Sequence, residues 1–173
     1  MRTIGALLLA IVLNAAAIHD THADDVPDFN LKTPNGERIQ LKSLLKKGPV
    51  LLDFWSIWCK PCLKAMPKLQ ALYEAHKEDG LTVLAVNEDS LRGQAMVRPF
   101  LRAQNLTFPV VFDVSDGNVM LEMNVTALPT TILIDRNGKI VMQKCGYSAR
   151  HSKVLKMVVE ALMKMDGRMC APE

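Results

Sequence analysis

The apolar residues of this chain gather in short runs that polar turns separate. Val50–Trp55, Leu81–Val86 and Val110–Phe112 are almost wholly apolar, and each run follows a Gly or a Pro. Runs of this length bounded by turn residues predict buried strands. Apolar residues recur at every third or fourth position over residues 59–77, and a second amphipathic stretch covers about residues 94–104, which predicts a helix after each of the first two strands.

Hairpin signals stand at both ends of this region. Turn residues at 33–36 separate the segments Pro27–Leu31 and Arg38–Leu41, and turn residues at 135–138 separate Thr130–Ile134 from Lys139–Cys145. We also expect short helices over residues 43–45 and 117–123 and a final helix over about residues 150–165. This order predicts an α/β fold with a central mixed β-sheet flanked by helices, formed as one domain by residues 24–173.

The first 23 residues differ from the rest of the chain. One cation, Arg2, precedes the apolar segment Ile4–Ile18, and small residues stand at Ala15–Ala17 and Thr21–Ala23. This pattern predicts a signal peptide over residues 1–23 and export to the periplasm. The apolar segment is shorter than the roughly 20 residues that a helical membrane span needs, so an uncleaved anchor is the less favoured alternative.

Charge and compartment narrow the classes of function. The net charge is +3, and no basic run stands beside aromatic residues, so nothing indicates a nucleic-acid partner. The chain has four cysteines. In an oxidising compartment, disulfide chemistry is the default use of cysteine.

Cys59 and Cys62, with two residues between them, stand at the turn between the predicted strand 50–55 and the helix that follows. A helix N-terminus stabilises a thiolate, so we expect Cys59 to be the nucleophile, with a pKa lowered from about 8.5 to roughly 3.5–7.5. Its sulfur can also accept a hydrogen bond from the backbone N–H of Cys62. Cys62 is expected to be the more buried, resolving thiol. Lys60 and Pro61, between the two cysteines, are expected to tune the site.

Asp53 is the only charge in the apolar strand 50–55. Burial of a carboxylate without a partner raises its pKa, so we expect Asp53 to be a proton shuttle for Cys62. A structural zinc site would need four ligands, and no second cysteine or histidine pair has suitable spacing. We therefore expect neither a metal nor a cofactor.

Four motifs of this chain occur together in one known superfamily. They are Pro27-Asp28-Phe29 with the N-terminal hairpin, Asp53-Phe54-Trp55, Trp58-Cys59-Lys60-Pro61-Cys62 with Pro67, and Ala127-Leu128-Pro129-Thr130. With these motifs the chain resembles the thioredoxin superfamily and, within it, the exported thiol-disulfide oxidoreductases of the TlpA/ResA type. The segment between the predicted strand 81–86 and Val125 resembles the central strand-helix insertion of that subfamily.

The resemblance implies a site and a function. Pro129 would be cis, the backbone of Leu128 would pair with an extended substrate segment, Trp58 would border the substrate surface, and Trp55 would belong to the core. The substrates would be protein disulfides, which the enzyme would reduce through Cys59 and Cys62. Some members of the subfamily serve cytochrome c maturation. The enzyme would need a thiol donor protein, either soluble or embedded in the membrane.

Two positions depart from the resemblance. Exported reductases often carry Asn where this chain has Asp53, and Glu where it has Ala65. Thioredoxin has an acid at the position of Asp53 but places a lysine near it, at the position of Ala85. The route of the proton is therefore open at this stage.

Three questions stay open in the sequence. The N-terminal hairpin and Ser56, three residues before Cys59, also fit a peroxiredoxin-like thiol peroxidase. A non-catalytic partner-binding or copper-binding module is a further alternative, because Met157, Met163, Met165 and Met169 occur near His151. An intrachain bridge between Cys145 and Cys170 is within reach of the final helix and the tail that follows it.

Overall fold

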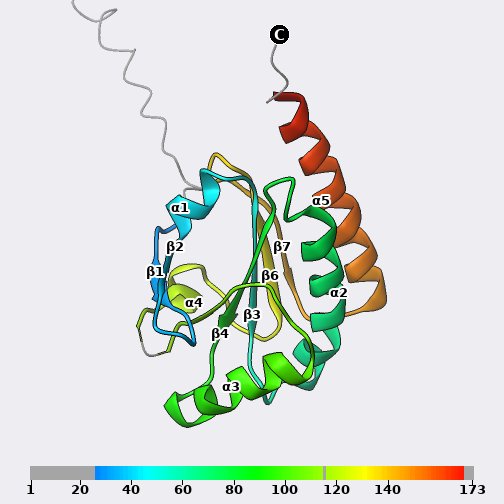
Figure 1. Cartoon of the computed structure of the whole chain (residues 1–173). Coiled ribbons are helices and arrows are strands. Elements are labelled where there is room, and N and C mark those ends of the chain that lie inside the picture. The colour runs from blue at the N-terminus through cyan, green and yellow to red at the C-terminus, as the bar shows by residue number, and fades with distance from the viewer. Residues whose placement is uncertain (1–25, 115, 170–173) are drawn as a thin grey trace, which may run out of the picture.

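Seven strands of the described chain form one mixed sheet (Figure 1). The computed structural model describes residues 26–114 and 116–169. In the sheet the strands follow the order β2-β1-β5-β4-β3-β6-β7. They are β1 Asn30–Lys32, β2 Arg38–Gln40, β3 Val50–Trp55, β4 Thr82–Asn87, β5 Val110–Phe112, β6 Thr130–Ile134 and β7 Ile140–Cys145. The three strands β3, β4 and β5 run parallel, and the remaining pairs are antiparallel.

Helices cover both faces of the sheet. They are α1 Leu41–Leu45, α2 Lys60–His76, α3 Leu91–Ala103, α4 Val119–Glu122 and α5 Ala149–Met169. The long helices α2 and α5 lie against each other on one face, while α1 and α4 lie on the other (Figure 1). Each layer has its own apolar core, one formed with α2, α3 and α5 and the other with α1 and α4.

The central strand β3 contributes side chains to both cores. Alternate residues of a strand point to opposite faces, and the two sets are Leu51 and Trp55 toward α2, and Val50, Leu52 and Phe54 toward α1. All five side chains are fully buried. Asp53 belongs by alternation to the first set, so the sheet places its carboxyl group on the face that α2 and α5 cover.

The predicted α/β architecture, with a central mixed sheet, an N-terminal hairpin and a strand-helix insertion, is confirmed. The boundaries moved by a few residues: α3 begins at Leu91 instead of about residue 94, and α5 continues to Met169. The expected signal peptide over residues 1–23 lies outside the described residues. Within the described ranges, no helix is long and apolar enough to cross a membrane.

Gly80 lets two loops at one end of the sheet approach each other closely. Its φ is +101°, and a Cβ atom built on it would lie 2.5 Å from the carbonyl oxygen of Lys47. Any side chain at this position therefore meets both backbone strain and a backbone atom that cannot move aside easily.

We predict that Gly80→Ala lowers the free energy of unfolding by about 3 kcal/mol, because strain of about 1–2 kcal/mol adds to the clash. Gly36→Ala is the matched control, since φ is +88° there and nothing lies within 4 Å of an added Cβ. The free energy of unfolding of that variant should fall by only about 1–2 kcal/mol. Urea unfolding of both variants measures the difference, and equal losses would show that the contact with Lys47 is unimportant.

Candidate active site

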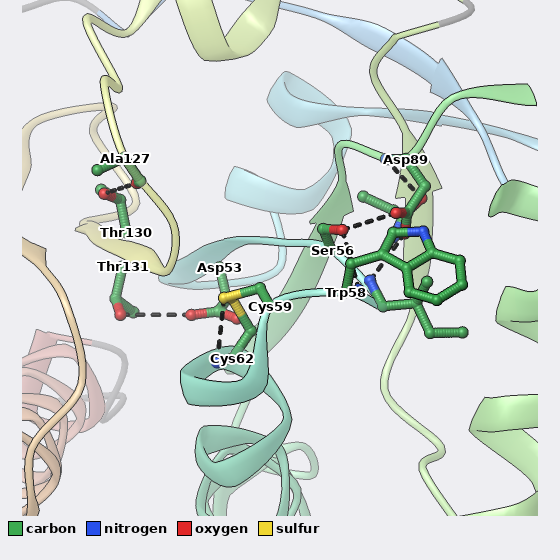
Figure 2. Close-up of a disulfide and its surroundings, with 11 residues drawn as sticks. Asp53, Ser56, Trp58, Cys59, Cys62, Asp89, Ala127, Thr130 and Thr131 are labelled. Atoms are coloured by element: carbon green, nitrogen blue, oxygen red, sulfur yellow. Dashed lines mark hydrogen bonds between the residues drawn. A yellow bond between two sulfur atoms is a disulfide. The ribbon is translucent and has the colours of Figure 1, made fainter.

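The end of β3 delivers two cysteines to the first turn of α2 (Figure 2). Cys59 is the N-cap residue of α2, and its Sγ accepts a hydrogen bond of 3.3 Å from the backbone N–H of Cys62. The two residues form a disulfide, with their Cα atoms 5.2 Å apart. Cys62 is fully buried, whereas Cys59 is half-buried. A reagent can therefore approach Cys59 more easily than Cys62.

Asp89, which follows β4, holds the three-residue loop before Cys59. Its Oδ1 accepts a hydrogen bond of 2.6 Å from the hydroxyl of Ser56, and its Oδ2 accepts one of 2.9 Å from the backbone N–H of Ile57. Asn87 also donates to Oδ2, at 2.7 Å. The carboxylate is 3% exposed, so these charge-assisted bonds form away from water. They fix the loop that presents Cys59 (Figure 2).

Asp53 lies in the middle of the sheet, paired with Ala85 of β4 on one side and Thr131 of β6 on the other. It is 1% exposed. Its Oδ1 accepts a hydrogen bond of 3.3 Å from the hydroxyl of Thr131, and its Oδ2 has no hydrogen-bond partner among the described residues. Burial raises the pKa of Asp53 from 3.8 to about 7, and the bond from Thr131 opposes part of that shift. The carboxyl group can thus take up or release a proton near neutral pH.

The loop before β6 lies on the side of Asp53 opposite Trp58 (Figure 2). The peptide bond between Leu128 and Pro129 is cis, the conformation that the resemblance implied. The hydroxyl of Thr130 donates to the carbonyl oxygen of Ala127 at 2.7 Å, and the backbone N–H of Gly146 donates to that of Pro129 at 2.7 Å. Pro129 is buried and Leu128 is half-buried. These bonds hold the loop in one conformation.

Two further carboxyl groups lie at the edge of the sheet where Asp89 stands. Asp113 is 2% exposed and accepts hydrogen bonds from the backbone N–H groups of Val119 and Met120 at 2.9 and 2.8 Å, which caps α4. Burial, together with the neighbouring charges of Asp113 and Asp89, raises the pKa of Glu88 to about 8. The described residues contain no group of three His, Cys, Asp or Glu that could hold a metal ion.

The other predicted site residues differ in how far they are exposed. Trp58 is 70% exposed beside the disulfide, whereas Trp55 is fully buried in the core. Lys60 and Pro61 are exposed at the start of α2. Ser56, on which the peroxidase alternative relied, has its hydroxyl bound to Asp89.

The structure describes only some of the residues on which the copper-binding alternative and the Cys145–Cys170 bridge depend. Met157 and Met165 are exposed on α5, whereas Met163 is buried in the core, and the side chain of Met169 lies outside the described part. Cys145 is an exposed free thiol. Cys170, its candidate partner, lies outside the described residues.

Asp89 is a site residue that was not predicted from the sequence. The signal was present, because the polar residues Asn87-Glu88-Asp89 stand where a buried strand ends, at the edge where the neighbouring parallel strand ends. Which of the three would turn toward the cysteines depended on the path of the loop that follows β4.

A disulfide between cysteines with two residues between them, at the N-terminus of a helix on a thioredoxin fold, defines a class of protein. The two sulfur atoms themselves carry the electrons, and the buried carboxyl group of Asp53, on the face of the sheet that α2 covers, can exchange a proton near neutral pH. The chain is a thiol-disulfide oxidoreductase.

Comparison with known proteins agrees with this class and gives the family. A model of the AhpC/TSA family matches residues 22–143. Sporulation thiol-disulfide oxidoreductase A of Bacillus subtilis is 38% identical over 119 residues, which cover 68% of this chain and 70% of that protein. Thiol-disulfide oxidoreductase ResA of the same organism is 39% identical over 126 residues, which cover 73% and 68% of the two chains.

Solved structures show the same architecture. A putative thiol:disulfide interchange protein DsbE from Chlorobium tepidum superposes with a TM-score of 0.73 at 34% identity, covering 81% of this chain and 96% of that one. StoA from Bacillus subtilis superposes with a TM-score of 0.64 at 34% identity, covering 78% and 97%. The chain belongs to the AhpC/TSA family, within the thioredoxin superfamily.

The raised pKa of Asp53 makes the stability of the protein depend on pH. The folded protein holds a proton on Asp53 up to about pH 7, whereas the unfolded chain loses it near pH 3.8. Between these values the folded state binds more protons than the unfolded state, so its stability falls as the pH rises. Above about pH 7 Asp53 is deprotonated in both states, and the folded protein carries the full free-energy cost of burying its charged carboxylate.

We predict that Asp53→Asn removes this fall, because the amide does not titrate. Relative to the variant, the free energy of unfolding of the wild type should decrease from pH 4 to pH 7 by up to roughly 4 kcal/mol and then level off. Urea unfolding of the oxidised proteins at several pH values measures it. Glu37→Gln, at an exposed carboxyl group, is the control and should follow the wild type. Parallel profiles for wild type and Asp53→Asn would contradict the assignment.

Proposed function

We propose that this protein is an exported reductase of protein disulfides, in which Cys59 attacks the substrate and Cys62 resolves the mixed disulfide. The observation that carries the proposal is the asymmetry of the pair: the half-buried Cys59 caps α2, and the fully buried Cys62 lies one turn further in. A substrate disulfide can reach the first sulfur but not the second. Only an intramolecular attack by Cys62 then releases the product.

The position of Cys59 stabilises its thiolate. The positive end of the α2 dipole and the N–H of Cys62 both favour negative charge on this sulfur. Lys60 adds a cation next to it, but its exposure keeps the electrostatic effect small. Lys60 and Pro61 therefore adjust the reactivity of Cys59, while the helix N-terminus makes the larger contribution to stabilising its thiolate.

Asp53 takes the proton that Cys62 must lose. A buried thiol is a poor nucleophile until it is deprotonated, and a carboxyl group with a pKa near 7 can accept a proton at neutral pH. Asp53 lies on the face of the sheet that α2 covers, with its Oδ2 unbonded within the described chain. In reduction of a substrate, the proton moves from Cys62 to Asp53 as Cys62 attacks.

The substrate would lie between Trp58 and the cis-proline loop. The exposed ring of Trp58 offers an apolar surface, and the backbone around Leu128 and Pro129 offers groups to an extended segment. This mode recognises a backbone rather than one sequence, which suits an enzyme that reduces several proteins.

The cellular setting follows from the resemblance to exported TlpA/ResA-type enzymes and from the apolar segment at the N-terminus. We place the protein in the periplasm, where a thiol donor protein, soluble or membrane-embedded, would reduce Cys59 and Cys62 again. Cytochrome c maturation is the process we propose. No cofactor is needed, because the two sulfur atoms carry the electrons.

We predict that Cys62→Ser traps substrates as mixed disulfides on Cys59, because nothing then resolves the first adduct. Incubation with oxidised protein extracts followed by non-reducing electrophoresis and mass spectrometry should recover these adducts. Cys59→Ser is the matched control and should recover none, since Cys62 is fully buried. Capture of apocytochrome c would support the proposed process. Adducts that form equally on both variants would contradict the assigned roles.

We predict that Asp53→Asn slows the reduction of insulin by the protein near neutral pH by about 100-fold or more, because Cys62 loses its base. The loss should shrink toward pH 9, where solvent hydroxide deprotonates the thiol directly. An unchanged rate between pH 6 and pH 9 would exclude a proton-transfer role for Asp53.

A further inference from the structure

A cavity of about 440 Å³ lies between α2 and α5, and Asp53 reaches it from the sheet. Its walls are mostly apolar and include Ala65, Leu72 and Leu155. Small side chains on both sides create the space, among them Ala65 on α2 and Ala149 on α5. The volume is far larger than the roughly 30 Å³ that one water molecule occupies, so water can enter and reach the buried carboxyl group.

Three buried polar atoms without a described hydrogen-bond partner belong to residues that line this cavity. Nδ1 of His76 lies 3.6 Å from Oδ2 of Asp79, within ion-pair distance. The other two are Oδ2 of Asp53 and Nε2 of His151, whose residue is 8% exposed. Such atoms are rare in folded proteins, and each requires an explanation. Water between Asp53 and His151 would satisfy these two atoms and would connect them.

The contacts of His151 define which of its nitrogen atoms can take a proton. Nδ1 lies 2.9 Å from the carbonyl oxygen of Gly146. A carbonyl oxygen only accepts hydrogen bonds, so Nδ1 must carry a hydrogen and donate it. In the neutral ring Nε2 then has a free lone pair, and it is the position at which a proton can arrive.

The backbone fixes the ring of His151 in place and ties it to the active-site loop. His151 stands in the first turn of α5, where its N–H donates to the hydroxyl of Ser148 at 3.1 Å. Gly146, which accepts from Nδ1, donates its own N–H to the carbonyl oxygen of Pro129 at 2.7 Å. The imidazole is therefore held on the same framework as the cis-proline loop.

The other titratable side chains around the cavity are more exposed. They are Lys68 and His76 from α2, Tyr147 from the turn before α5, and Lys153 and Lys156 from α5. The three lysines are exposed, Lys156 lies 3.7 Å from Glu160, and His76 lies 3.6 Å from Asp79. Among the described residues that line the cavity and titrate, only Asp53 and His151 are more than nine-tenths buried.

We propose that His151 relays protons between Asp53 and solvent through water in this cavity. This rests on the proposed role of Asp53. When Cys62 attacks the mixed disulfide, one S–S bond forms to Cys59, one S–S bond breaks, and the substrate leaves as a thiolate. The proton of Cys62 passes to Oδ2 of Asp53, then through water to Nε2 of His151, and from there to solvent. The electrons stay on sulfur, so no further reactant is needed.

The test is a single-turnover oxidation of the reduced full-length protein by oxidised glutathione, followed by stopped-flow tryptophan fluorescence from pH 5 to pH 9. The key variant is His151→Asn, because the Asn amide can still donate to Gly146 but does not titrate. It should react about tenfold more slowly at pH 7, a smaller effect than the 10²–10⁴-fold of a direct base. The difference should vanish toward pH 9, where hydroxide replaces the relay.

Two further variants separate a relay from a structural role. His151→Ala leaves room in the cavity for free imidazole, and added imidazole should restore most of the lost rate. His76→Asn changes the other histidine of the same cavity and should react like the wild type at every pH. An unchanged rate of His151→Asn would overturn the relay, and so would a loss that is equal at all pH values and that imidazole does not restore. If the wild type itself failed to react with oxidised glutathione, the proposed function would fail instead.

Discussion

The chain must turn from β3 into α2 within a few residues, and the buried carboxylate of Asp89 makes that turn rigid. It binds the hydroxyl of Ser56 and the N–H of Ile57, and Cys59 in turn donates its N–H to the carbonyl oxygen of Ser56 at 3.1 Å. Because Cys59 is placed as the N-cap, its sulfur meets the N–H of Cys62. The placement of Cys59 therefore depends on a carboxylate in the loop that follows β4. A looser turn would separate the sulfur from the helix N-terminus that stabilises its thiolate.

The same fold also buries the carboxyl group of Asp53, although burial of a carboxyl group in an apolar core is unfavourable. Strand β3 is buried along its whole length, and Asp53 lies in its middle with one hydrogen bond from Thr131. A carboxyl group there destabilises the folded protein above neutral pH, and the apolar residues of two cores offset that loss. The same burial raises the pKa of Asp53 to about 7, which is the property that its proposed role as a base requires. In that proposed role, stability and activity oppose each other at this residue.

Two of the positions that depart from the resemblance lie next to Asp53 or on its cavity. Ala65 of α2 borders the cavity, and Ala85 of β4 pairs with Asp53 in the sheet. Alanine has no charged group, so neither residue offers Asp53 a charged partner. His151 is the other buried titratable group that lines that cavity within the described chain. The sequence therefore left the route of the proton undetermined. The cavity between α2 and α5, which Asp53 and His151 both line, is the route that we propose.

The sequence by itself determined the order of strands and helices, the position of the two cysteines at the start of α2, and the burial of Asp53. These follow from local periodicity and from turn residues, which act over a few neighbouring positions. Only the tertiary structure decided that Asp89 holds the active-site loop and that Asp53 and His151 border one cavity. These pairs are separated by dozens of residues along the chain, and side-chain contacts over such distances depend on how strands align and helices pack. In the sequence, His151 was noted only because several methionines lie near it. The packing of α5 places it on the cavity that Asp53 also lines.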